Sequence, residues 1–315
     1  MSIARVQFSP AVVLAAAGLL FALTATAQQP TAKAALATVQ PEEKTLTLFG
    51  QKLHYLEAGQ DGPVVILVHG LGADSTIWAA NLATLSAKTH VFAIDQIGFG
   101  RSDKPPLDYR IQTFAEFLYA FMQAAKIPRA TLVGNSLGGW VAAELAVQHP
   151  EAVEKLILAD SAGIKPRNWK GWRSFPVNLN PASLLDTRKM FEKIFFDKSV
   201  ITDQLVERVF ENRMRNGDSY TISRVLEGLD SNQWVDKQLD KVKAPTLIVW
   251  GQEDALTPLE QAETFHKDIA NSRLEVIAQC GHAPQIEKPA EFNKLVLDFL
   301  FPSPQKTPAD ARTSF

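Results

Sequence analysis

The sequence predicts an α/β protein with a doubly wound, mostly parallel sheet of eight strands and an inserted helical cap. Two observations lead to this expectation. Between Val64 and Ala159, short apolar runs alternate with helical patterns, which is typical of crossover units in a parallel sheet. From Ser161 to about Asp240 the alternation stops, and aromatic residues recur among arginines at roughly helical spacing. The 315 residues and the 46% hydrophobic content allow a sizeable core.

Each expected strand is a short run of apolar or alternating residues bounded by turn residues. The run Val64 to Val68 is apolar throughout, as in a strand that is covered on both faces. The strands are expected over residues 45–49, 52–57, 64–68, 90–94, 130–133, 153–159, 245–250 and 274–278. Helices are expected from residue 74 or 75 to 86, over 111–125, from the turn at 134–139 through about 147, and over 259–270 and 289–300.

The first residues have the pattern of an export signal. Arg5 supplies positive charge, Pro10 to Leu23 is an apolar run, and Ala25-Thr26-Ala27 offers a cleavage site before Gln28. The run is short for a membrane span, so we expect a cleaved signal peptide over residues 1–27, no stable membrane span, and a periplasmic or secreted protein. An uncleaved N-terminal anchor is the alternative.

The remaining chain divides by composition. A polar, alanine-rich segment over residues 28–44 is expected to be flexible, as is the tail over residues 302–315, which has no apolar period. The sheet-forming core is assigned to residues 45–160 and 241–301. Because ligands of such sheets bind beyond the carboxyl ends of the strands, the helical segment 161–240 is interpreted as a cap over the site.

Composition excludes several function classes. A net charge of −2 and a pI near 6.3 show no basic excess, so nucleic acid is not an expected partner. The six histidines are scattered without ligand spacing, and no dinucleotide fingerprint follows the first crossover strand, so neither a metal nor a cofactor is expected. Cys280 is the only cysteine, which rules out an internal disulfide, and we assign it a packing role.

Ser136 stands where a strand pattern turns sharply into a helix pattern. The strand at 130–133 is followed by Gly134-Asn135-Ser136-Leu137-Gly138-Gly139 and then by a helical pattern. Glycines on both sides allow a tight turn, which leaves the serine hydroxyl at its apex. The N–H of Leu137 opens a helix and is therefore free to meet an oxygen bound next to the serine.

A serine nucleophile needs a base and an acid that orients the base. His282 follows the last expected strand, in Cys280-Gly281-His282-Ala283-Pro284, and is the candidate base. Asp254 follows the strand that precedes this last strand, and Asp160 follows the strand that comes after the turn at Ser136. Each aspartate is a candidate for the acid.

The Gly-x-Ser-x-Gly turn and the chain order Ser136, Asp254, His282 resemble the α/β-hydrolase family over about Thr45 to Leu300. The resemblance implies the α/β-hydrolase fold and a catalytic triad of these three residues. It favours Asp254 over Asp160, because an acid in a Gly-x-x-Asp setting before a proline-started helix is the commoner arrangement in that family.

The same resemblance assigns two further loops. His69-Gly70-Leu71-Gly72 is similar to the oxyanion loop of the family, so the N–H groups of Leu71 and Leu137 are expected to hold the developing oxyanion. The ring of His69 is interpreted as structural. The loop from Asp95 to Pro105 is interpreted as a scaffold for the pocket wall.

The predicted reaction is acyl transfer to water through an acyl-enzyme. A serine in the elbow excludes the family branches with an aspartate nucleophile. The aromatic cap favours a small hydrophobic ester, so a carboxylesterase is the first choice. The alternative is a C–C bond hydrolase that cleaves vinylogous diketones from aromatic ring fission. Cys280-Gly281-His282 followed by Pro284-Gln285 and Glu287 is similar to the sequence of that branch, although Ala283 stands where a Trp is common. Cap arginines would hold the substrate carboxylate. A slow-turnover receptor on the same fold is the third interpretation.

Overall fold

The computed structural model describes residues 40–231 and 233–302, which lie within one compact unit, Thr38–Phe315. The predicted signal peptide, residues 28–39 of the predicted flexible segment and residues 303–315 of the tail lie outside the described residues.

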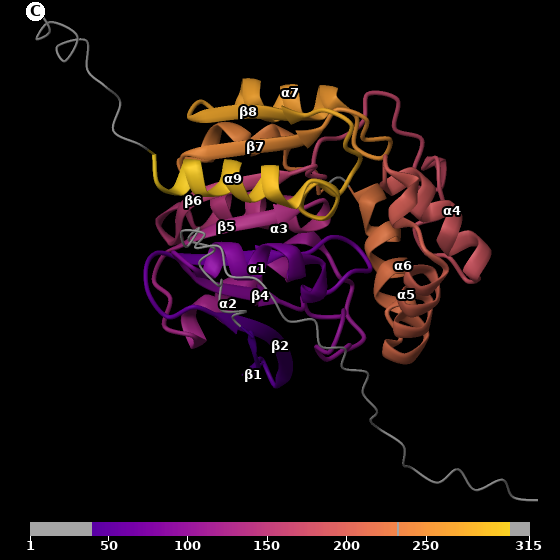
Figure 1. Cartoon of the computed structure of the whole chain (residues 1–315), viewed down its shortest axis with the longest axis horizontal. Helices are drawn as coiled ribbons and strands as arrows, with labels where there is room; N and C mark the ends of the chain where they lie inside the picture. Colours follow the sequence, from indigo (N-terminus) through magenta and orange to yellow (C-terminus); the bar gives the residue numbers. More distant parts are fainter. Residues whose placement is uncertain (1–39, 232, 303–315) are drawn as a thin grey trace, which may run out of the picture. The chain divides into compact units, whose positions relative to one another are not determined.

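An eight-stranded sheet forms the centre of the described chain (Figure 1). Its spatial order is β1-β2-β4-β3-β5-β6-β7-β8. β1 and β2 run antiparallel to their neighbours, and the remaining strands are parallel, which confirms the predicted mixed sheet. The strands are β1 Glu42–Leu48, β2 Gln51–Ala58, β3 Val64–Val68, β4 His90–Ile94, β5 Ala130–Asn135, β6 Val153–Ala159, β7 Thr246–Gly251 and β8 Ser272–Ile277.

β1 begins three residues before the expected boundary, at Glu42, so residues 42–44 of the segment predicted to be flexible are strand. The reason is pairing with β2: Glu42 lies opposite Glu57 in the ladder, and Nζ of Lys44 donates to Oε2 of Glu57 over 2.8 Å. A partner strand therefore orders a polar stretch that has no apolar pattern of its own.

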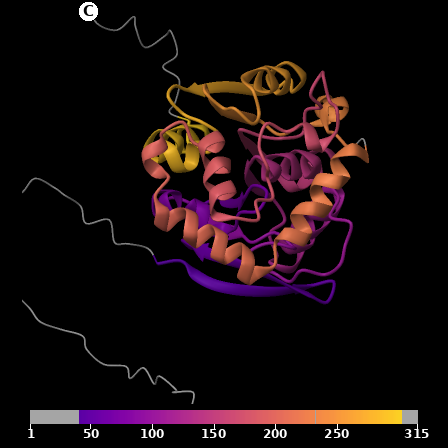
Figure 2. The same cartoon turned by 90° about the vertical axis from the view of Figure 1, so that its right-hand side faces the viewer.

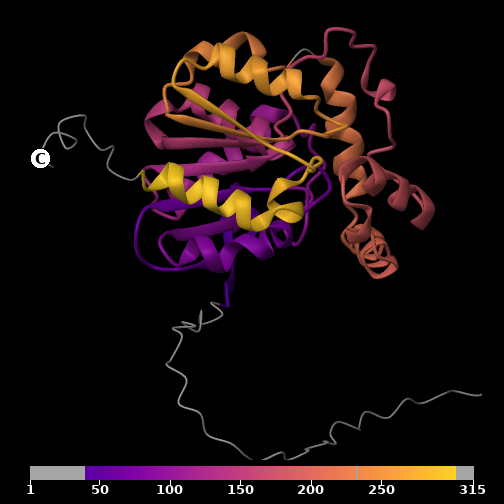
Figure 3. The ribbon, with the colours of Figure 1, turned by 45° about the horizontal axis from the view of Figure 1, so that its top comes forward.

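Helices cover both faces of the sheet. α2 Ile111–Ala124, α3 Leu137–Gln148 and α7 Leu259–Asp268 pack on one face. α1 Ala79–Ser86 and α9 Pro289–Leu300 pack on the other, and Figure 3 shows α7 and α9 on opposite sides of the strands. The helix expected from residue 74 or 75 is divided into a 3₁₀ turn, Ser75–Trp78, and α1. This double layer buries β5 and β7 completely and most of β3, β4 and β6.

Three helices between β6 and β7 form the segment predicted to be a cap: α4 Leu184–Ile194, α5 Asp203–Asn216 and α6 Ser219–Gly228. Figure 2 shows them in front of the sheet at one end. The cap joins the core through an aromatic stack, in which the rings of Trp234 and Trp140 are 4.9 Å apart. Trp140 belongs to α3, so the stack lies just beyond the elbow.

Part of the apolar surface of the cap is exposed. Leu185 is 62% exposed, and Leu184 and Phe196 are also exposed, whereas Phe191 and Phe195 are buried in the apolar cluster of α4. Only one face of α4 meets other elements. Within the described ranges 40–231 and 233–302, no helix has the length and hydropathy that a bilayer crossing requires.

Candidate active site

Ser136 makes the turn between β5 and α3 by itself, since the strand ends at Asn135 and the helix begins at Leu137. Its φ of 55° is one that residues with a side chain rarely adopt, as expected for a strained nucleophile elbow. The backbone is packed tightly around it. A Cβ on Gly138 would lie 2.2 Å from the carbonyl oxygen of Val68, so only glycine fits there.

His282 lies between β8 and the short helix α8 Pro284–Glu287, which the sequence did not predict. Its N–H donates to the carbonyl oxygen of Ile194 at the end of α4, over 2.7 Å. Its carbonyl oxygen accepts a hydrogen bond from Nδ2 of Asn135, 3.1 Å away. Because Asn135 directly precedes Ser136, this bond ties the histidine loop to the elbow. Sequence reasoning had not assigned Asn135 a role.

Asp254 bonds the ring of His282. Nδ1 of His282 and Oδ2 of Asp254 are 2.7 Å apart, and the two side chains are 8% and 0% exposed. Thr257, which sequence reasoning missed, donates its hydroxyl to the same carboxylate oxygen over 2.5 Å. The second oxygen of Asp254 accepts the N–H groups of Leu256 and Thr257, at 2.7 and 3.1 Å. The carboxylate is therefore held by four hydrogen bonds.

These contacts keep Asp254 ionised. Burial by itself would raise the pKa of this carboxyl group, but the charge of His282 and the hydrogen bonds from His282 and Thr257 outweigh it and lower the pKa below its usual value. An ionised acid at Nδ1 fixes the ring tautomer and leaves Nε2 of His282 as the basic nitrogen.

Asp160, the competing acid, does not bond the ring. Its Oδ1 accepts the N–H of Gly251 over 2.9 Å, and its Oδ2 has no partner among the described residues. The carboxyl group lies close by, since one oxygen each of Asp160 and Asp254 and a ring nitrogen of His282 lie within 4.8 Å of one another. Burial and the negative charge of Asp254 raise the pKa of Asp160 well above its usual value.

No hydrogen bond joins the hydroxyl of Ser136 to the ring of His282 within the described residues. The two residues follow β5 and β8, which are separated in the sheet by β6 and β7, and they are linked through Asn135. Hydrogen bonds of this kind are often long in an enzyme without substrate and shorten only when substrate binds. The structure therefore brings Asp254 to His282 directly and Ser136 to the same edge of the sheet.

Two backbone N–H groups are available beside Ser136. Leu137 is the first residue of α3, and neither its N–H nor that of Leu71 finds an acceptor in the described part of the chain. The loop with Leu71 passes close to the nucleophile, because a Cβ on Gly70 would lie 3.2 Å from Cβ of Ser136. Both predicted oxyanion donors thus flank the elbow.

The ring of His69 holds this loop in place. Its Nδ1 donates to the carbonyl oxygen of Gly70 over 2.8 Å, and its Nε2 accepts the N–H of Gln96 over 3.0 Å. Burial lowers the pKa of His69, which matches a neutral ring that donates at one nitrogen and accepts at the other. The ring has a structural role, as expected.

Asp95 organises the neighbouring loop from the end of β4. Its carboxylate accepts the N–H groups of Ser75 and Arg101, at 2.7 and 2.9 Å, and bonds the ring of His54 at 2.9 Å. Burial opposes ionisation, but these hydrogen bonds lower the pKa of Asp95 below its usual range. These bonds go to residues of the surrounding scaffold.

Arg213 of α5 is one of the cap arginines that the sequence analysis considered as a group, without distinguishing it from the others. It is 4% exposed and is the one buried arginine of the described chain, yet its Nε and Nη1 have no partner there. Its Nη2 reaches the oxyanion loop, 2.9 Å from the position that a Cβ on Gly72 would take. A signal existed: Arg213 lies seven residues after Val206, on the buried stripe of an otherwise polar helix.

Asp218, at the start of α6, is the acid that acts electrostatically on Arg213. It is 5% exposed, and Nζ of Lys104 lies 3.5 Å from its Oδ1. Burial raises the pKa of Asp218 to about 6, although Lys104 and Arg213 oppose the shift. The arginine is thus only partly neutralised from within the protein.

Cys280 is fully buried in the apolar cluster beneath α1 and α9, and burial raises the pKa of its thiol well above the ordinary value. A buried neutral thiol is inert, which agrees with the packing role. Among the described residues, Asp160, Asp254 and His282 form a group whose potential metal-ligand atoms lie within 4.8 Å of one another. Since the ring nitrogen and the carboxylate there bond each other, hydrogen bonding accounts for the grouping.

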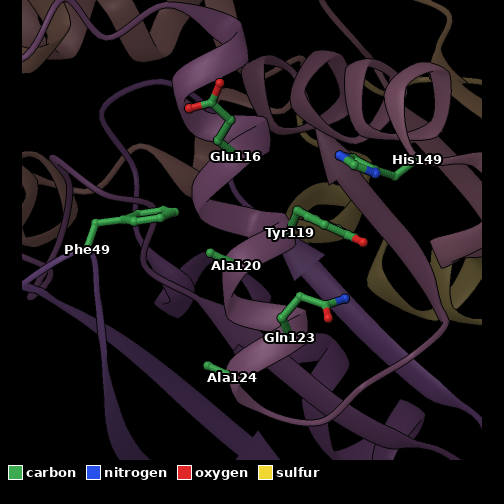
Figure 4. A pocket seen from close by; sticks show the side chains of 7 residues that line it. All are labelled: Phe49, Glu116, Tyr119, Ala120, Gln123, Ala124 and His149. Carbon is green, nitrogen blue, oxygen red and sulfur yellow. The ribbon is translucent and has the colours of Figure 1, made fainter.

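A surface pocket of about 600 Å³ lies away from these residues (Figure 4). Most of its lining comes from α2, with the exposed ring of Phe49 on one side and His149, which stacks on Tyr119 at 3.8 Å, on the other. It contains no nucleophile and no member of the predicted triad.

Comparison with known proteins identifies the family. Residues 63–289 match the family model described as alpha/beta hydrolase fold. The chain belongs to the α/β-hydrolase family. The family match covers the elbow at Ser136, the bonded pair of Asp254 and His282, and most of the sheet.

Relatives within the α/β-hydrolase family include C–C bond hydrolases. The 2-hydroxymuconate semialdehyde hydrolase of Pseudomonas sp. (strain CF600) is 32% identical over 80% of this chain and 91% of its own length. A mutant form of the meta-cleavage product hydrolase CumD is 27% identical with a TM-score of 0.74, over 81% of this chain and 97% of that one. A membrane phospholipase A described as a bacterial virulence factor is 29% identical, also with a TM-score of 0.74, over 85% and 88%. The relatives support hydrolase activity and favour the C–C alternative over the ester interpretation.

Proposed function

We propose that this chain is a serine hydrolase that cleaves a C–C bond beside a carbonyl group in acidic products of aromatic ring fission. The observation that carries the proposal is the bond between Asp254 and His282 at the strand edge where Ser136 makes the elbow. The choice of bond rests on the relatives, because the same residues would also cleave an ester.

In this proposal His282 takes the proton of Ser136 through Nε2 as the serine oxygen attacks the carbonyl carbon. The oxyanion is held by the N–H groups of Leu71 and Leu137, each worth about 3 kcal/mol in related acyl-transfer enzymes. The adjacent C–C bond then breaks, its electron pair is delocalised onto the distant carbonyl as a dienolate, and His282 returns the proton to carbon. Water repeats the cycle on the acyl-enzyme, while Asp254 orients the ring.

Arg213 supports an acidic substrate. An arginine that is buried without a partner carries a large desolvation cost unless an anion joins it. Its Nη2 reaches Gly72, next to the proposed oxyanion donor Leu71. A carboxylate placed there would be bound through a charge-assisted hydrogen bond while the carbonyl lies at Ser136. Neutral esters offer no such partner.

Carboxylic esters are the second candidate class, and two observations favour them. A membrane phospholipase A has the same TM-score as the meta-cleavage product hydrolase and a slightly higher identity. Ala283 follows the proposed catalytic histidine and packs with Phe191 of α4 and with Phe195, the residue after that helix, which leaves an apolar wall beside the site. This wall suits an alkyl chain.

The first experiment separates a hydrolase from a receptor. We expect a fluorophosphonate probe to label the protein, and labelling to be lost in Ser136→Ala while the folded fraction, measured by circular dichroism, is unchanged. Turnover of a vinylogous diketone with a terminal carboxylate is then compared with that of nitrophenyl esters of increasing acyl length. Faster cleavage of the esters would replace the C–C assignment, and absence of labelling in folded protein would exclude both.

Arg213 gives a second, independent test. In Arg213→Met we expect KM for the carboxylate-bearing diketone to rise about 10-fold to 100-fold, the value of a charge-assisted hydrogen bond. KM for a neutral nitrophenyl ester should stay within about twofold, as should both values in the control Arg215→Met, whose side chain is exposed on the same helix. Equal effects on charged and neutral substrates would show that Arg213 acts on the fold instead.

A further inference from the structure

Asp160 is a buried acid for which the proposed mechanism has no use. It follows β6, is 0% exposed, and has a φ of 45°, a left-handed conformation that is rare for an aspartate outside special turns. Its backbone is fixed to the neighbouring strand, because its N–H donates to the carbonyl oxygen of Val249 over 3.0 Å. The strained backbone therefore aims one carboxyl group at the acid of the triad.

The carboxyl groups of Asp254 and Asp160 accept different numbers of hydrogen bonds from the protein. Asp254 accepts four hydrogen bonds, two on each oxygen, whereas Asp160 accepts one, from the N–H of Gly251. Their oxygens lie within 4.8 Å, with no water-exposed surface on Asp160 to screen a second charge. One negative charge is expected to be stable in such a site and two are not. The charge belongs on Asp254, which has the donors.

A proton on Asp160 also resolves an unpaired atom. Oδ2 of an ionised Asp160 can only accept a hydrogen bond, and it is buried without a donor among the described residues. As a carboxylic acid it becomes a donor, and the carboxylate of Asp254 is the acceptor beside it. The other titratable groups that act on it are Glu287 of α8, whose charge also disfavours ionisation, and His282. Burial and Asp254 raise the pKa of Asp160, in agreement with this state.

We propose that Asp160 is a positioning residue that stays protonated at neutral pH and donates a hydrogen bond to Asp254, which holds that carboxylate against Nδ1 of His282. The inference rests on the proposed role of Asp254 and His282 in hydrolysis, and it assigns to Asp160 no contact with substrate. A protonated Asp160 has the hydrogen-bonding pattern of an amide: one oxygen donates toward Asp254, and the other accepts from the N–H of Gly251.

Three variants test the proposal through rescue by the conservative substitution. Asp160→Asn keeps a donor and an acceptor without a charge, so kcat should stay within about threefold of wild type. Asp160→Ala removes the proposed donor to Asp254 and leaves the Gly251 N–H unpaired, so kcat should fall about 10-fold to 100-fold with KM unchanged. Asp254→Asn, the positive control, should lose about 10⁴-fold. An Asn variant as impaired as the Ala variant, or an unimpaired Ala variant, would overturn the proposal.

The pH profile adds a readout that a merely structural role would not change. Ionisation of Asp160 at alkaline pH removes its donor and adds a repelling charge, so wild-type kcat should decline there, whereas Asp160→Asn should hold its activity further into the alkaline range. An identical alkaline limb in both proteins would contradict the assignment.

A measurement independent of turnover keeps the inference separate from the proposed function. At neutral pH, the infrared difference spectrum of wild type minus Asp160→Asn should contain the carbonyl band of a protonated carboxyl group. Glu144→Gln is the matched control, because Glu144 is a buried acid of α3 whose pKa burial also raises, and it should leave kcat unchanged. A carboxylate band in place of the acid band would refute the protonated state even if the chain proved not to be a hydrolase.

Discussion

At the scale of single residues, the cap supplies a charge pair whose balance depends on pH. Arg213 has no hydrogen-bonding partner for two of its nitrogens in the described chain, and the nearby Asp218 has a pKa raised to about 6. Above that pH the acid is ionised and competes with a substrate anion for the arginine. Below it the acid is neutral, and the positive charge is available to a ligand.

This balance predicts a pH-dependent affinity. As the pH falls through about 6, KM of wild type for a carboxylate substrate should decrease about threefold, because Arg213 loses its competing anion. Asp218→Asn should have the lower KM throughout and no such transition. The test is to measure KM of Asp218→Asn across this pH range. Glu207→Gln is the control, because Glu207 is an exposed acid of α5. An unchanged transition in Asp218→Asn would refute the role of Asp218.

Asp218 also determines how the free energy of unfolding changes with pH. The pKa of Asp218 is raised on folding, so the folded state retains its proton longer, and the free energy of unfolding should fall as the pH rises from about 3.9, the unfolded value, through about 6. Denaturant unfolding of Asp218→Asn should show a flatter pH dependence over this window, whereas an unchanged slope would contradict the raised pKa.

The residues that sequence reasoning found and missed differ in one respect. Ser136, Asp254 and His282 each belong to a short motif beside turn residues, so the sequence alone indicates their chemistry. Asn135, Thr257 and Arg213 act through contacts made only in space: Thr257 reaches Asp254 and His282 by its hydroxyl, at 2.5 and 3.2 Å. No local pattern distinguishes such a threonine from one that caps a turn.

At the scale of elements, Glu287 of α8 connects the cap to the catalytic loop. Its Oε2 accepts the N–H groups of Phe196 and Asp197, just after α4, at 2.7 and 3.1 Å. Its Oε1 accepts the N–H of Gly281 over 2.9 Å. One carboxylate thus bonds the segment that follows the cap helix and the residue before His282 at once.

Removing this carboxylate should loosen both partners. In Glu287→Ala we expect the free energy of unfolding to fall by about 2 kcal/mol, since hydrogen bonds to a charged acceptor are lost, and kcat to fall with it because the position of His282 is less restricted. Chemical denaturation and steady-state kinetics measure the two effects. Glu291→Ala, at an exposed position of α9, is the control and should change stability by less than about 0.5 kcal/mol. A stable but inactive variant would separate the two roles.

The elements themselves were predictable where burial leaves a pattern in the sequence. The bounds of β3, β4, β6 and α9 agree with the expected ones, because each is an apolar or amphipathic run bounded by turn residues. The polar start of β1 and the four-residue helix α8 were not predicted. Pairing with β2 orders the first, and the second is too short to show a helical period.

At the scale of the whole molecule, the chain order of the elements predicted the fold, but not how the cap meets the core. Alternating strands and helices leave few topologies open, so the sheet follows from sequence. The stack of Trp234 on Trp140 and the bond from His282 to Ile194 join residues far apart in the chain, and no periodicity encodes them.

The expected export signal yields a separate prediction. If residues 1–27 are a cleaved signal peptide, the mature chain begins at Gln28 and is found outside the cytoplasm. N-terminal sequencing of protein from a periplasmic fraction checks this, with Ala27→Lys as a variant in which cleavage should fail. A chain that retains Met1 in the membrane fraction would support the anchor alternative.

The chain leaves the sheet after β6 and re-enters it at β7, and these two strands are neighbours. Because the two strands are parallel, the chain must cross back over the sheet to join them, which takes about a dozen residues or more. Any exchange of this crossover must therefore keep the carbonyl oxygen of Ile194 and the N–H groups of Phe196 and Asp197, because these groups bond His282 and Glu287 of the core.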